Sequence, residues 1–123
     1  MNVVDSSGWL EYFAEGPNAG HFAPVINLPE QLVVPTVTLY EVFKVALRES
    51  NENDALQACS AMQQGLVADF TAKVAVAASK LSLKHALPMA DAVILATARE
   101  HGATLWTQDV HFKDISGVKY FPK

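Results

Sequence analysis

Four carboxylates stand at positions in this sequence where they could share one metal ion. Asp5 follows a short apolar run at the start of the chain, and Asp109 follows another such run after a polar turn. Glu41 and Asp91 come after prolines, early in expected helices. Carboxylate oxygens from separate segments are the hard ligands that Mg²⁺ and Mn²⁺ prefer, whereas zinc sites generally use nitrogen and sulfur. The pattern therefore indicates a site for a divalent cation.

Carboxylates gathered in this way would repel one another. Two unit charges 4 Å apart interact by about 4 kcal/mol at an effective dielectric constant near 20. A cation offsets this repulsion, and without it at least one carboxyl group is expected to have its pKa raised by its like-charged neighbours. A cation held there could activate a water for in-line attack on a phosphodiester and neutralise the leaving oxygen. The expected chemistry is hydrolysis without a protein nucleophile.

Each acid also has a purely structural interpretation. Asp5 lies before two serines and could be only an N-cap or turn residue, and Asp109 could be only a turn former. Asp91 fits the first turn of a helix, where the helix dipole favours an acid. Glu41 could lie on a solvated helix face. Singly none of the four decides the question, and it is their combination that favours a metal site.

Strand and helix patterns alternate along the chain. Short apolar runs predict strands at residues 2–5, 32–34, 66–69, 104–106 and 118–121. Helical spacing predicts helices at 9–13, with Ser6-Ser7-Gly8 as its cap, and at 18–26, 36–50, 51–64, 71–85 and 89–101. This alternation favours an α/β fold, a three-layer α/β/α sandwich with a mostly parallel central sheet. In such a sheet the functional crevice lies outside the carboxyl ends of the strands, where Asp5 and Asp109 are expected.

Length and composition indicate one folded domain, residues 1–123. The chain has 123 residues, half of them hydrophobic, and a single cysteine that excludes an internal disulfide. No apolar run is long enough for a membrane span, so we expect a soluble cytoplasmic protein. Nine Lys and Arg against 13 Asp and Glu argue against a nucleic-acid binder that relies on bulk positive charge. If four acids belong to a metal site, however, the remaining charges balance at 9 against 9.

Four sequence blocks, at residues 3–10, 34–42, 87–98 and 105–109, resemble the PIN-domain family, in particular the VapC-type toxins of bacterial toxin–antitoxin pairs. The resemblance covers nearly the whole chain, and the blocks stand in the family's order. It implies that the catalytic and metal-binding acids of the family fall on Asp5, Glu41, Asp91 and Asp109. Ser6 and Thr107 resemble the small hydroxyl residues that orient ligands or water in such sites.

One position departs from the family's pattern. Many relatives carry a further acid two residues after the last of the four, whereas this chain has His111 there. Neutral imidazole is a softer ligand than Mg²⁺ prefers, so we expect His111 to lie at the rim of the site. The alternative is that it weakens or retunes a second metal position.

The resemblance implies a Mg²⁺-dependent endoribonuclease, with Mn²⁺ as a second candidate metal, that cleaves RNA by a metal-activated water and is held inactive by a VapB-type antitoxin. Lys44, Arg48, Lys80 or Lys84 could hold the RNA backbone or could simply be solvated. Two alternatives come from other classes. A phospho-receiver-like signalling module is disfavoured because Asp5 is followed by serine rather than by a second acid. A catalytically silent PIN-like RNA-binding scaffold would be favoured by the loss of a site acid, and none is lost.

The sequence also predicts a homodimer. Aromatic residues are concentrated in two amphipathic helices, and one core could be too small to bury them all. The alternative is that they pack internally. The aromatic residues in question are Trp9, Tyr12, Phe13, Tyr40 and Phe43.

For the antitoxin, we expect a helix that lies over the acidic site with a basic side chain that reaches the carboxylates, since a guanidinium binds carboxylates bidentately.

Overall fold

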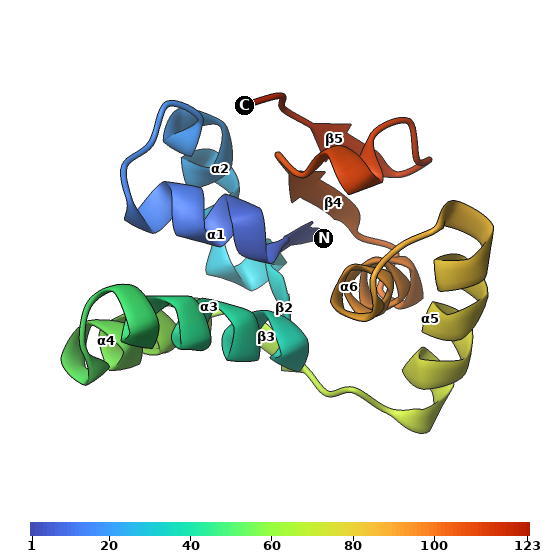
Figure 1. The fold of residues 1–123 in the computed structure, drawn as a ribbon, viewed down its shortest axis with the longest axis horizontal. Coiled ribbons are helices and arrows are strands. Elements are labelled where there is room, and N and C mark those ends of the chain that lie inside the picture. Colours follow the sequence, from blue (N-terminus) through green and yellow to red (C-terminus); the bar gives the residue numbers. More distant parts are fainter.

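The computed structural model describes residues 1–123, which form five strands and six α-helices (Figure 1). The strands are β1 (Asn2–Val4), β2 (Val33–Pro35), β3 (Leu66–Ala68), β4 (Thr104–Thr107) and β5 (Val118–Tyr120). The helices are α1 (Ser6–Phe13), α2 (Ala19–Ile26), α3 (Thr36–Glu49), α4 (Glu52–Met62), α5 (Ala72–His85) and α6 (Met89–Glu100). Two 3₁₀ helices, Pro29–Gln31 and Val110–Phe112, have no counterpart among the elements expected from the sequence.

Every predicted strand and helix is present, and most ends agree within two residues. The exception is the start of α1, which begins three residues earlier than predicted. The residue that caps this helix is Asp5, whose carboxylate accepts a hydrogen bond from the Gly8 backbone N–H. The serines after Asp5 therefore belong to the first helical turn rather than to its cap.

All strand pairs are parallel. The strands β1, β4 and β5 form one sheet in the order β1-β4-β5, and β2 pairs with β3. A single parallel bridge between Asn2 and Leu32 joins the two sheets, which gives the spatial order β3-β2-β1-β4-β5. The strands are only three or four residues long, and this bridge is the one backbone pairing between the two sheets. Because all strands run in the same direction, their carboxyl ends lie at one edge.

Successive strand residues pack against helices on opposite faces of the sheet, as the period-two geometry of strands requires. Val3 and Val33 belong to a core that they share with α5 and α6. Val4 and Val34 belong to a second core with residues of α1, α2, α3 and α4. Figure 1 shows α5 and α6 on the side of the sheet away from α3 and α4. The predicted three-layer α/β/α arrangement is confirmed.

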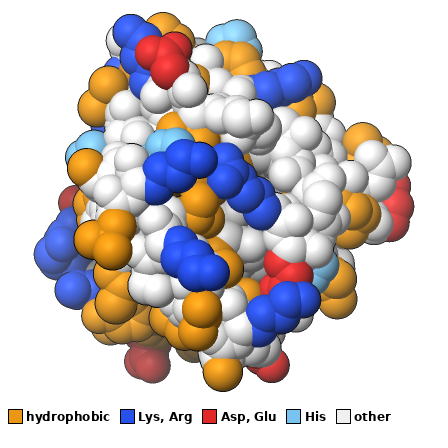
Figure 2. Space-filling view, turned by 90° about the vertical axis from the view of Figure 1, so that its right-hand side faces the viewer, with side chains coloured by type: hydrophobic (Ala, Val, Ile, Leu, Met, Phe, Trp, Pro, Cys, Tyr) orange, Lys and Arg blue, Asp and Glu red, His pale blue; other side chains and the backbone are white.

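On the face that carries α5, Lys and Arg side chains lie among hydrophobic ones (Figure 2). No helix is long and apolar enough to cross a membrane, since even α3 and α5 have only 14 residues each.

Close packing at the start of α1 leads to a testable prediction. A Cβ built on Gly8 would lie 2.6 Å from Val4 Cγ1 and 2.9 Å from a ring carbon of Phe22. Gly8→Ala is therefore expected to lower the free energy of unfolding by about 1–3 kcal/mol, although alanine is the better helix former. Gly20→Ala is the matched control, because nothing lies within 4 Å of its Cβ position in α2. Urea unfolding should rank the proteins Gly8→Ala, wild type, Gly20→Ala in rising stability, and an unchanged Gly8→Ala would contradict this packing.

Candidate metal centre

Asp5 directly follows the last residue of β1 and is almost fully buried, with 2% of its surface exposed. Its carboxylate accepts hydrogen bonds from the Thr107 hydroxyl at 2.7 Å, from the Ser7 hydroxyl at 2.8 Å and from the Gly8 N–H at 2.9 Å. Burial raises the pKa of Asp5 to about 6, because desolvation outweighs these hydrogen bonds, and the charge of Asp109 adds to the rise. The fold therefore favours the uncharged form of Asp5 unless a positive charge lies nearby.

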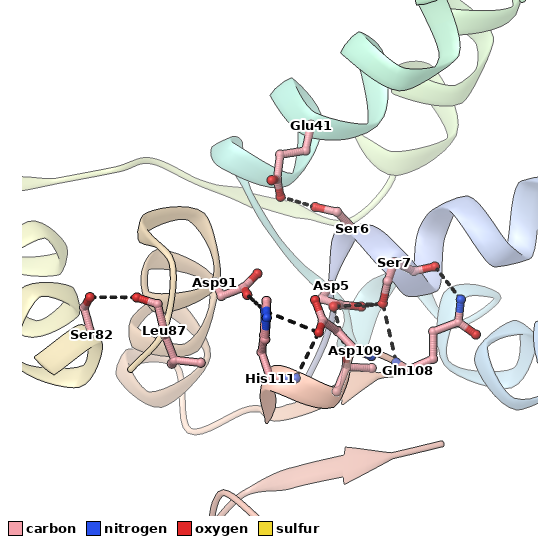
Figure 3. A network of polar contacts seen from close by, with 11 residues as sticks. Asp5, Ser6, Ser7, Glu41, Ser82, Leu87, Asp91, Gln108, Asp109 and His111 are labelled. Carbon is pink, nitrogen blue, oxygen red and sulfur yellow. Dashed lines mark hydrogen bonds and ion pairs between the residues drawn. The ribbon is translucent and has the colours of Figure 1, made fainter. Parts of the chain in front are cut away.

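Asp91, Asp109 and His111 form a compact group at the same edge of the sheet. One ligand atom from each of the three lies within 4.8 Å of the other two. His111 Nδ1 is 2.9 Å from Asp91 Oδ2 and 3.4 Å from Asp109 Oδ1 (Figure 3). Asp91 lies in the first turn of α6, whereas Asp109 and His111 belong to the turn after β4. The fold thus brings together residues that lie about 20 positions apart in the sequence.

The charges of this group act on one another. Burial raises the pKa of Asp91, the hydrogen bond from His111 lowers it, and the charges of Asp109 and Glu41 raise it. The hydrogen bond to Asp91 and the charge of Asp109 raise the pKa of His111. A protonated His111 therefore acts as a counter-ion for both aspartates. The sequence predicts that repulsion between like charges raises a carboxyl pKa, whereas in the structure burial is the larger cause for both Asp5 and Asp91.

Glu41 reaches the centre from α3. Its carboxylate accepts a hydrogen bond from the Ser6 hydroxyl at 2.5 Å, across 35 residues of sequence. Figure 3 shows this pair at one side of the centre and the Asp91–His111 pair at another. Glu41 and Asp5 lie outside the compact group of three ligand atoms, although the charge of Glu41 acts on Asp91 and that of Asp109 acts on Asp5.

Thr107 links two of the acids. Its buried hydroxyl donates to Asp5 Oδ2 and accepts a hydrogen bond from the Asp109 backbone N–H at 2.9 Å. The two hydroxyl residues that the sequence proposed as supporting groups, Ser6 and Thr107, therefore both bond to site carboxylates. Their roles in catalysis remain predictions.

Three polar residues that support Asp5 directly or through one another were not predicted from the sequence as part of the site. Ser7 donates its hydroxyl to Asp5, and Gln108 donates its amide to the Ser7 carbonyl at 3.4 Å. Asn18, from the turn before α2, donates to Gln108 Oε1 at 3.0 Å. The position of Gln108 between Thr107 and Asp109 was the only available signal, and no spacing rule points to Asn18. His111 has a half-exposed side chain, as expected of a rim residue, yet it contacts two of the acids.

The structural interpretations of Asp5, Asp91 and Asp109 hold as well. Asp5 caps α1, Asp91 lies in the first turn of α6, and Asp109 accepts a hydrogen bond from the His111 backbone N–H at 2.9 Å. These roles do not account for the burial of Asp5 or for the proximity of Asp91 and Asp109. Two carboxylate oxygens and one imidazole nitrogen at this spacing fit the donor set of a divalent cation, and the imidazole suits Mn²⁺ better than Mg²⁺.

The buried state of Asp5 predicts how stability depends on pH in the absence of metal. The folded-state pKa of about 6 lies above the ordinary value of 3.8, so the fold favours the protonated acid. This contribution is fully present below pH 3.8 and is lost as the pH rises through 6, at a cost of about 3 kcal/mol. In EDTA, the unfolding free energy of Asp5→Asn should therefore rise relative to that of wild type by about 3 kcal/mol as the pH is raised from below 3.8 to above 6. Urea titrations across that range measure it, and a pH-independent difference would refute the raised pKa.

Comparisons with known proteins agree with this fold. Residues 3–118 match the family model of the PIN domain. A chain of a toxin–antitoxin complex from Klebsiella pneumoniae superposes with a TM-score of 0.85 at 22% identity, and each chain covers 100% of the other. VapC20 from Mycobacterium tuberculosis, described as a sarcin–ricin loop cleaving toxin, gives a TM-score of 0.72 at 17% identity, with 92% of each chain covered.

A third structure, VapBC2 from Rickettsia felis bound to a DNA fragment from its promoter, gives a TM-score of 0.74 at 14% identity. It covers 98% of this chain, and this chain covers 97% of it. No curated protein sequence matches the chain. At these identities the superpositions establish the fold alone, whereas the family model spans almost the whole sequence. The chain belongs to the PIN domain family.

Proposed function

We propose that this protein is a metal-dependent endoribonuclease and the toxin of a toxin–antitoxin pair. The observation that carries the proposal is the gathering of acids from β1, α3, α6 and the turn after β4 around one edge of a parallel sheet. A buried carboxylate and two further acids within ligand distance of an imidazole are costly to assemble unless a cation or an imidazolium offsets their charge. Membership of the PIN family removes the receiver-like alternative.

The ion would be held by the carboxylates of Asp5, Asp91 and Asp109. The imidazole of His111 would be an additional ligand, and Glu41 would lie near the edge of the site. The proposed metal is Mg²⁺, and Mn²⁺ is the second candidate because of the imidazole. When bound, the cation supplies Lewis-acid chemistry, which lowers the pKa of a water and neutralises charge on a phosphodiester.

The surrounding residues keep the acids in place. Thr107 and Ser7 hold the Asp5 carboxylate in one orientation, and Ser6 holds Glu41. The Ser6 and Ser7 hydroxyls both donate to carboxylates, so neither is paired with a histidine base as a serine nucleophile would be. Hydrolysis by water is the reaction class that this arrangement favours.

The central prediction concerns Asp5→Asn. The amide keeps the shape of the acid but carries no charge for a cation, so the protein should fold and its cleavage of RNA should fall to the level that wild type shows in EDTA. Purified chain is incubated with total RNA in Mg²⁺, Mn²⁺ or EDTA, and the products are resolved on a gel. Asp114→Asn is the matched control, because Asp114 is exposed in the loop before β5. Full cleavage by folded Asp5→Asn would refute the metal mechanism, and the absence of cleavage by wild type would favour the silent scaffold.

An antitoxin has a surface to occupy beside the centre. A groove of about 870 Å³ lies between α1, α3 and α4 and extends to Ser7 and Gln108 next to Asp5. Its lining combines apolar side chains, among them Leu10, Phe13 and Val45, with charged ones, among them Glu11, Arg48 and Asp54. The similar structures from Klebsiella pneumoniae and Rickettsia felis come from toxin–antitoxin assemblies. We propose that an antitoxin helix lies in this groove and places a basic side chain at the carboxylates.

Fewer aromatic side chains are exposed for a dimer contact than the sequence indicated. The rings of Trp9, Tyr12 and Phe13 pack against one another, and Trp9 is buried. Tyr40, by contrast, is 63% exposed on α3, and Leu47, seven residues along the same helix, is 46% exposed. We propose that this face of α3 contributes to a homodimer.

One set of experiments tests both partners. Light scattering of the isolated chain is expected to give twice 13.3 kDa, and a monomer would refute the dimer. Ala46→Arg, which fills the groove, should abolish inhibition by the product of a neighbouring antitoxin gene while RNA cleavage persists. Ala75→Arg on the exposed side of α5 is the control. If the antitoxin still inhibits Ala46→Arg fully, or if replacing its basic residue by alanine changes nothing, it acts elsewhere.

A further inference from the structure

A second groove, of about 700 Å³, lies between α5 and α6 and has no part in the acidic centre. Its charged lining consists of Lys73 and Lys80 from α5 and of Arg99 and Glu100 from α6. Between them lie apolar side chains, among them Val76, which is 59% exposed. Figure 2 shows Lys and Arg side chains around exposed hydrophobic groups on the face that carries α5.

The charge of the chain is divided between its two halves. Residues 1–70 contain two Lys and Arg against nine Asp and Glu, whereas residues 71–123 contain seven against four. Of those four acids, Asp91 and Asp109 belong to the metal centre. A protein of net charge −4 therefore carries a locally basic surface, which its overall charge conceals.

The basic side chains of α5 form a row. Lys73, Lys80 and Lys84 are seven and four residues apart, so they lie on one side of the helix over about 16 Å. Lys80 and Lys84 have no ion-pair partner. Lys73 is 3.6 Å from Glu100, but its side chain is 81% exposed, and such pairs are weak. The row is free to bind anionic groups.

Arg99 lies across the groove from this row. One of its guanidinium nitrogens donates to the Ser116 carbonyl at 3.3 Å, which positions the side chain and leaves other N–H groups free. Arg99 is eight residues along α6 from Asp91, a distance of about 12 Å in a helix. The groove is thus joined to the metal centre by a single rigid helix.

We propose that the α5–α6 groove binds the phosphodiester backbone of the RNA outside the point of cleavage. The inference rests on the proposed nuclease function and adds a second contact surface to it. Charge complementarity identifies the occupant, since exposed ammonium groups in a row release counter-ions from phosphates that they bind. The exposed apolar groups between them suit the faces of sugars and bases. A second copy of this chain is a poorer occupant, because two basic grooves that face each other would repel.

The test compares two double variants with equal loss of charge. Lys73→Gln/Lys80→Gln removes two cations from the groove. Lys119→Gln/Lys123→Gln removes two elsewhere, and Lys119 packs over Trp106, on the sheet face opposite to α5. Binding of a fluorescent RNA hairpin is measured by anisotropy in EDTA, so that the probe stays intact, at several salt concentrations between about 50 and 200 mM. Cleavage of the same hairpin in Mn²⁺ and light scattering of each variant are recorded in parallel.

The groove variant is expected to bind about ten-fold more weakly at the lowest salt and to lose about 1.4 from the slope of log K against log salt, while the control keeps the wild-type slope. Equal affinities for the two variants, or no binding by any protein, would overturn the inference. A groove variant that changes its oligomeric state but not its RNA affinity would overturn it too and would identify a second copy as the occupant. Loss of binding without any cleavage by wild type would support the groove and refute the nuclease, whereas cleavage with equal affinities would do the reverse.

Discussion

Like charges crowd at the carboxyl edge of the sheet, and their repulsion constrains the residues that surround them. Parallel strands end at the same edge, so residues that follow them are brought together whatever their separation in sequence. Here the residues are acids, and one of them, Asp5, is buried. Burial disfavours a charged carboxylate, which is reflected in its pKa of about 6. The fold accepts this cost where a cation would offset it.

The hydrogen bonds around Asp5 show how the charge is managed without a metal. The Thr107 hydroxyl, the Ser7 hydroxyl and the Gly8 N–H all donate to its carboxylate. A Cβ on Gly8 would lie within 3 Å of Val4 and Phe22, so the first turn of α1 packs against both residues most comfortably where no side chain is present. The capping of α1 and the orientation of the acid are therefore one structural feature.

His111 gives the centre a second means of balancing charge. Its imidazole lies against Asp91 and Asp109, and its pKa is raised by both. The protonated ring is a counter-ion, and the neutral ring offers a nitrogen donor at the same place. Charge is also unevenly distributed along the chain, since most acids lie in the first 70 residues and most bases lie on α5 and beyond.

The amino-acid sequence was enough to predict the regular elements and to propose a chemistry for the acids. Apolar periodicity located every strand and α-helix, because burial of one face imposes a period on the residues that form it. The two 3₁₀ helices, which are only three residues long, are too short to show such a period. The four acids could be named because strand ends and helix starts mark the functional edge of a parallel sheet. Which groups contact one another became visible only in the folded chain. The pairing of Ser6 with Glu41, the contact of His111 with Asp91 and the support of Asp5 by Thr107 join residues 35, 20 and 102 positions apart. Such contacts depend on the packing of separate elements, and neither propensity nor spacing along the chain contains that information.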